Sequence, residues 1–108
     1  LNSTKLSGTG RNLLDISEIN ESLIRAISYG WRYRKMWESG MKIEDIERQE
    51  SRTHRTIYKY LNLSYLSPKI IDDIFTGKNP KNLNLQDLFK LADKEMSFNK
   101  QEIIFYNN

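Results

Sequence analysis

A group of basic and hydrogen-bonding side chains recurs at helical spacing near the middle of the chain. Positions i, i+1, i+4, i+5 and i+8 lie on one face of a helix. In this chain they hold His54, Arg55, Tyr58, Lys59 and Asn62. An arginine fork matches the O6 and N7 acceptors of guanine, whereas a lysine is a point charge suited to phosphate. The pattern therefore predicts contacts with duplex DNA, with Arg55 and Tyr58 at base edges and Lys59 at a phosphate.

Two short helices joined by a tight turn would position these side chains. The first, Lys42 to Glu50, holds four acids and two bases. Thr53 is well placed to cap the second and is also a candidate DNA contact. From Ser51 to Leu66 there are three bases and no acid, and Arg52 is a further candidate phosphate contact. This order is typical of a helix-turn-helix, which places its second helix in a DNA groove. The alternative is a helical hairpin with an ordinary solvated face.

The segment Trp31 to Trp37 (WRYRKMW) interleaves aromatic and basic residues. Such a segment can bind a nucleic-acid backbone and stack on bases, or it can be the edge of a core with a solvated rim. Aromatic residues at helical spacing usually pack in a core, so we favour the core interpretation for the aromatic side chains. Arg32 and Lys35 are kept as candidate phosphate contacts.

Size and composition narrow the possible functions. A chain of 108 residues is expected to form one domain, too small for a roomy enclosed active site. With no cysteine and one histidine, neither a disulfide scaffold nor a zinc centre is expected, and no cofactor. The chain also lacks a glycine-rich phosphate loop, a nucleophile elbow and paired histidines. We therefore expect no enzymatic activity from this chain and no small-molecule substrate.

Charge and hydropathy favour an anionic partner and give no sign of a membrane. The net charge is +3, with 17 bases against 14 acids, which supports nucleic-acid binding weakly. No apolar run approaches the ~20 residues needed to span a bilayer, and no signal peptide is visible, so a cytoplasmic location is expected. The chain begins with Leu1 instead of methionine, which suggests a piece of a longer protein.

The periodicity of the remaining chain predicts an all-α fold of five to six helices around a central helix-turn-helix. Residues 1–15 are expected to be a flexible N-terminal arm or linker, and residues 16–108 a helical DNA-binding domain. The expected helices run from about Ser17 to Glu38, Lys42 to Glu50, Thr53 to Leu63, Ser67 to Gly77, Asn84 to near Glu95, and within Met96 to Tyr106.

Apolar positions on these helices predict where the core lies. One shared core is expected to bury Ile46, Ile57, Leu61, Ile70, Ile74, Leu85 and Leu88. A last apolar cluster is expected near the C-terminus, at Phe98, Ile103, Ile104, Phe105 and Tyr106. The acidic doublet Asp72-Asp73 is expected to be structural, because adjacent helical side chains point in different directions.

Two stretches, IEDIERQESRTHRTIYKYL and LNLSYLSPKIIDDIFTGKNPKNLNLQDL, carry a family resemblance. Together with the chain up to Tyr106 they resemble the C-terminal region of some phage-type and mobile-element serine recombinases of the resolvase and invertase family. That region has a helix-turn-helix similar to the ParB and KorB group. The longest match runs from Leu61 to Leu88, and Trp31 to Met36 looks like the helix that precedes the hairpin. The resemblance implies target-DNA recognition for a site-specific recombinase whose catalytic domain lies outside this chain.

Two residues depart from that pattern. Glu47 lies where such hairpins usually have a small residue, and Arg52 lies where the turn usually buries an apolar side chain. Either the hairpin opens slightly or both charges swing outward. The departure leaves a second hypothesis open: a helical protein–protein interaction module that tethers recombinase subunits or an accessory factor. A large exposed apolar patch would favour this second hypothesis.

Overall fold

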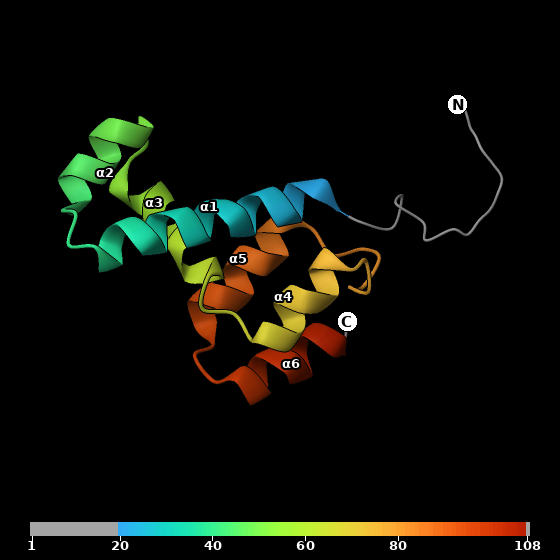
Figure 1. Cartoon of the computed structure of the whole chain (residues 1–108). Helices are drawn as coiled ribbons and strands as arrows, with labels where there is room; N and C mark the ends of the chain where they lie inside the picture. Colours follow the sequence, from blue (N-terminus) through green and yellow to red (C-terminus); the bar gives the residue numbers. More distant parts are fainter. Residues whose placement is uncertain (1–19, 108) are drawn as a thin grey trace, which may run out of the picture.

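Six helices and no strand form the part of the chain that the structure describes. The structure is a computed structural model, and it describes residues 20–107 (Figure 1). The helices are α1 (Glu21–Glu38), α2 (Ile43–Glu50), α3 (His54–Leu63), α4 (Pro68–Phe75), α5 (Leu85–Lys94) and α6 (Phe98–Tyr106). The all-α prediction is confirmed, and α2 and α3 form the expected helix-turn-helix. The predicted arm at residues 1–15 and the predicted cap at Ser17 lie outside the described residues.

Polar side chains begin these helices where the sequence predicts them. A side-chain oxygen at the N-cap accepts hydrogen bonds from backbone N–H groups that have no partner in the first turn. Thr53, Ser67 and Asn84 all accept such bonds, as predicted. Helix α1 begins at Glu21, because Asn20 caps it in the same way. Beyond the end of α4, Gly77 has a φ of +76°, the left-handed conformation expected of a glycine after a helix.

The long helix α1 is the axis on which the other helices pack. In Figure 1, α2 lies beside the C-terminal end of α1, whereas α4, α5 and α6 form a group on its lower side. Helix α3 crosses α1 and packs against it more extensively than any other helix does. Gly30 lies at this crossing, and a Cβ atom there would be 2.3 Å from the carbonyl oxygen of Tyr60. The two backbones can approach this closely only because residue 30 has no side chain.

The buried side chains form two clusters, so the prediction of one shared core is wrong. The hairpin core contains Tyr33, Ile46, Ile57 and Leu61. The main core contains Leu23, Ala26, Ile27, Leu63, Leu66, Ile70, Ile74, Leu83, Leu88, Leu91, Ala92 and Phe105. Tyr60 packs against both clusters. An 18-residue helix is about 27 Å long, so one end of α1 serves each cluster.

Several aromatic and aliphatic side chains lie closer to solvent than predicted. Six of the seven predicted core residues are buried, but Leu85 is only partly buried against the main core. In the aromatic-basic segment only Tyr33 is fully buried, whereas Trp31 and Trp37 are 43% and 44% exposed. Neither tryptophan is buried in a core, and both lie at its boundary: Trp31 stacks on Phe75 and Trp37 meets the edge of Tyr58.

The predicted C-terminal apolar cluster is also largely exposed. Only Phe105 is buried. Phe98, Ile103, Ile104 and Tyr106 are between 37% and 61% exposed. The reason is that α6 packs against α4 and α5 on one side alone within the described residues, while its apolar residues surround the helix.

The acidic doublet has the structural role expected of it. The Asp73 carboxylate lies 3.6 Å from Lys69 Nζ and accepts a hydrogen bond from the Tyr106 hydroxyl, so it joins α4 to α6. Asp72 is exposed, and its backbone carbonyl accepts a hydrogen bond from the Thr76 hydroxyl.

Candidate nucleic-acid interface

The turn between α2 and α3 is made by one left-handed residue and one cap. Ser51 has a φ of +56° and is the non-glycine residue with positive φ in the described part of the chain. Its backbone N–H donates to the carbonyl of Glu47, which ends α2. Two residues later, Thr53 Oγ1 accepts a hydrogen bond from the backbone N–H of Thr56. The break predicted at Ser51-Arg52 is confirmed, and α3 leaves the turn in a new direction.

Glu47 holds the start of α3 instead of swinging outward. Its Oε2 accepts a hydrogen bond from the backbone N–H of His54 at 2.6 Å and lies 3.0 Å from His54 Nδ1. A carboxylate is favourable at a helix N-terminus, where unpaired N–H groups and the helix dipole make the potential positive. The acid that departs from the family pattern therefore acts as a second cap across the hairpin.

Arg52 is half-buried, because its guanidinium lies over two aromatic rings. Its guanidinium carbon lies 4.4 Å from the ring centre of Tyr29 and 4.8 Å from that of Tyr60. A cation over aromatic faces is attracted by their negative potential, and the arginine stem covers the apolar edge beneath it. At this position of the turn, where an apolar residue is expected, Arg52 packs against the aromatic side chains instead. Of the two alternatives for Glu47 and Arg52, the outward swing of both charges is wrong, because Glu47 contacts His54 and Arg52 lies over Tyr29 and Tyr60.

The exposed face of α3 lines one groove with α5. All five residues predicted from the helical spacing line it: His54, Arg55, Tyr58, Lys59 and Asn62. The groove has a volume of about 640 Å³. The other wall comes from α5, which contributes Gln86, Phe89, Lys90 and Asp93. The sequence-predicted face of α3 is therefore a continuous surface, and α5 extends it.

Aromatic contacts position two of the groove side chains. The Tyr58 ring meets the rings of Trp37 and His54 edge to face, at centroid distances of 6.3 and 6.4 Å. Lys59 Nζ lies 5.6 Å from the ring centre of Phe89 on α5. Edge-to-face pairs and cation–ring contacts are favourable, so these side chains are held on the α3 face without being buried.

Gln86 and Lys90 are groove residues that the sequence analysis missed. They are four residues apart, so they share one face of α5, opposite the face that buries Leu88 and Leu91. Their polar spacing is visible in the sequence, but a polar face alone does not distinguish a binding surface from an ordinary solvated one. That α5 lies beside α3 is a tertiary fact that no local pattern contains.

Arg32 and Lys35 do not join the α3 groove. They line a separate hollow between α1 and α2 with Met36, Met41 and Gln49. The Nε–H of Arg32 is shared between both oxygens of the Glu50 carboxylate at 3.2 Å, and Arg32 Nη2 donates to Glu50 Oε2 at 2.8 Å. The hydrogen bond and charge of Glu50 raise the pKa of Arg32, and the hydrogen bond from Arg32 lowers the pKa of Glu50. The Arg32 charge is thus already paired, whereas Lys35 is exposed.

Residues 20–107 contain neither a metal-binding cluster nor a membrane-spanning helix. No group of three or more His, Asp or Glu side chains is close enough there to hold a metal ion. None of the described helices is long and apolar enough to cross a membrane. Comparison of the chain with protein-family models, with characterised proteins and with solved structures found no match, so the recombinase resemblance rests on the sequence patterns alone.

Proposed function

We propose that this chain binds duplex DNA through the exposed face of α3. The observation that supports the proposal is the single groove that collects all five sequence-predicted residues of α3. Helix α3 contains no acidic residue, and no carboxylate of the described residues lies within ion-pair distance of Arg55 or Lys59. Both cations are therefore available to an anionic partner.

Five groove residues have roles that follow from their chemistry. Arg55 suits the O6 and N7 acceptors of guanine, and the exposed Tyr58 hydroxyl can reach a base edge beside it. Lys59 suits a phosphate. On α5, Lys90 adds a second phosphate contact, and Gln86 adds a side chain with both donor and acceptor atoms. We place this activity in the C-terminal accessory domain of a site-specific recombinase, which is what the sequence resemblance implies.

The central test separates base contacts from phosphate contacts by fluorescence anisotropy with labelled duplexes across a salt series. Replacing Arg55 by alanine should cost roughly 1 to 3 kcal/mol on a preferred site and much less on random DNA. Replacing Lys59 by alanine should weaken both alike and reduce the salt slope by about one unit. Lys78→Ala is the matched control, because Lys78 is exposed in the α4–α5 connection and does not line the α3 groove.

A variant that is expected to strengthen DNA binding complements the two that should weaken it. Asp93 is the acidic residue in the lining of the α3 groove. Its carboxylate would face DNA phosphates, so Asp93→Asn should tighten binding to every duplex, most clearly at low salt. Absence of binding to any duplex at low salt would contradict the proposal. So would binding that survives replacement of both Arg55 and Lys59 by alanine.

A helical protein–protein interaction module is the second candidate function. The observation that favours it is the exposed apolar surface of α6, where Ile103 is 61% exposed. Apolar surface of this kind often marks a contact with another protein. Tethering of recombinase subunits or of an accessory factor would use this surface. Loss of DNA binding by the α3 variants, with protein contacts unchanged, would separate the two functions.

A further inference from the structure

Helix α6 is apolar on more sides than the described chain covers. Phe105 points into the main core, and the buried Gln101 amide donates to the Glu95 carbonyl. Ile103 and Ile104 lie on other sides of the helix and remain exposed. Apolar side chains therefore lie on several sides of α6, between the polar residues Asn99, Lys100 and Glu102. Exposed apolar surface of this kind often marks a contact with another chain.

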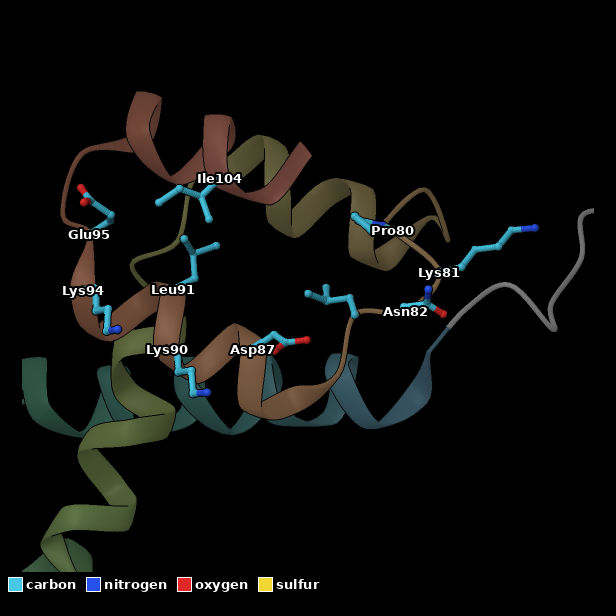
Figure 2. Close-up of a pocket in the computed structure, with 10 residues that line it drawn as sticks. Pro80, Lys81, Asn82, Asp87, Lys90, Leu91, Lys94, Glu95 and Ile104 are labelled. Atoms are coloured by element: carbon cyan, nitrogen blue, oxygen red, sulfur yellow. The ribbon is translucent and has the colours of Figure 1, made fainter. Parts of the chain in front are cut away.

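A groove continues this apolar surface between α5 and α6 (Figure 2). Leu83 and Leu91 lie at its base, and Figure 2 shows Leu91 and Ile104 pointing toward one another across it. The groove has a volume of about 590 Å³, enough for branched aliphatic side chains. Lys90 is the one residue that also lines the α3 groove. The two surfaces are otherwise separate.

The charges around this groove are of both signs. Its lining includes three lysines, Lys81, Lys90 and Lys94, and two acids, Asp87 and Glu95. None of the three lysines forms an ion pair with a carboxylate of the described residues. Next to it, the described outer side of α6 carries Asn99, Lys100 and Ile103, with a single charge.

We propose that a second copy of this chain covers the surface formed by the outer side of α6 and the α5–α6 groove. A two-fold contact brings the same surface of both copies together, so that surface must be complementary to itself. A rim of one sign would repel its own copy, whereas a mixed rim can pair lysines of one copy with acids of the other. The uncharged side chain of Ile103 can meet its own copy without repulsion, and interface centres are depleted of charged residues.

The contact places Ile103 of the two copies close to the two-fold axis, because it is the most exposed apolar side chain of α6. This position can be tested directly, since the chain contains no cysteine. A disulfide forms only when two Cα atoms are within about 7 Å. The Ile103→Cys chain should therefore give a disulfide-linked dimer under mild oxidation. Gln49→Cys, an exposed position on α2, is the matched control and should cross-link far more slowly.

Light scattering during size-exclusion chromatography gives the second measurement, without DNA. The mass of the unmodified chain should rise from 12.8 kDa toward twice that value as concentration increases. Ile103→Glu buries a charge in the contact and should raise the dissociation constant at least about tenfold. Gln49→Glu adds the same charge on α2 and should leave the constant unchanged.

Three results would overturn the proposal. They are a monomeric mass at every concentration, equal cross-linking of the two cysteine variants, and dimerisation of Ile103→Glu equal to that of the parent chain. Circular dichroism checks that Ile103→Glu keeps its helical content. If that variant unfolds, the cysteine pair decides the question by itself. None of these results bears on DNA binding by α3, so the two proposals can fail separately.

Discussion

At the scale of single residues, two charged side chains that break the hairpin pattern turn out to support it. Glu47 caps α3 through the backbone N–H of His54, and Arg52 stacks on Tyr29 and Tyr60. In both cases the long side chain contacts a residue that is at least seven positions away in the sequence. No local sequence pattern indicates such a contact. Both charged side chains are therefore accommodated by contacts within the fold, Glu47 by hydrogen bonds and Arg52 by aromatic rings.

Gly30 gives a prediction in which two effects of opposite sign compete. Replacing it with alanine should favour helix α1 by about 1 kcal/mol, because glycine is a poor helix former. The new Cβ, however, would lie 2.3 Å from the Tyr60 carbonyl oxygen, and backbone atoms cannot move aside by changing rotamer. We expect Gly30→Ala to lose at least about 1 kcal/mol of unfolding free energy in urea. A stabilised variant would mean that α1 and α3 do not cross here.

The Arg32–Glu50 pair gives a prediction about pH. The hydrogen bond from Arg32 lowers the pKa of Glu50 below its usual 4.5. A lowered pKa in the folded state stabilises the fold above the usual value, and this contribution disappears as pH falls through the lowered value. Glu50→Gln should therefore unfold more easily than the parent at pH 7. The difference should shrink at pH values below about 4.5.

The measurement is urea unfolding of both chains across this pH range. Glu44→Gln is the control, because it removes a carboxylate from the same helix without removing an ion pair among the described residues. A difference between Glu50→Gln and the parent that is independent of pH would mean that the carboxylate charge is not what matters.

At the scale of elements, α3 has two faces with different tasks. One face buries Ile57 and Leu61 in the hairpin core, and the opposite face lines the groove with α5. The groove side chains can present their polar ends only if the buried face holds α3 in register against α1. Packing on one side of the helix therefore determines what the other side can bind.

Leu61 tests this packing. Its side chain is 7% exposed, so truncation to alanine should leave a cavity in the hairpin core and cost roughly 2 to 5 kcal/mol of unfolding free energy. Leu85→Ala is the comparison, because Leu85 is only partly buried and should cost less. Chemical denaturation measures both. A loss below about 1 kcal/mol for Leu61→Ala would show that α3 is rotated relative to the structure.

At the scale of the whole molecule, α1 and α3 join the two clusters of buried side chains. Each of these helices contributes residues to both cores, and Tyr60 packs against both. Loss of either core would therefore remove packing partners from the other. The two cores should unfold together, although they are separate clusters.

The two tryptophans allow the unfolding of each core to be measured separately. Trp31 stacks on Phe75 of α4, and Trp37 contacts Tyr58 of α3. With Trp37→Phe the fluorescence reports the α4 side, and with Trp31→Phe it reports the hairpin side. In each variant the fluorescence midpoint in urea should equal the circular dichroism midpoint of the same chain, as two-state unfolding requires. Separate midpoints would show that the hairpin unfolds independently.

By itself, the sequence determined the local features: the helical class, the turn at Ser51-Arg52, the caps at Thr53, Ser67 and Asn84, and the polar face of α3. These follow from hydrogen bonding and periodicity within a few residues, so a local pattern contains them. The division into two cores, the inward turn of Arg52, the pairing of Arg32 and the meeting of α3 with α5 depend on contacts between distant segments. Only the tertiary structure determines these four features, because in each of them the contacting residues come from different parts of the chain.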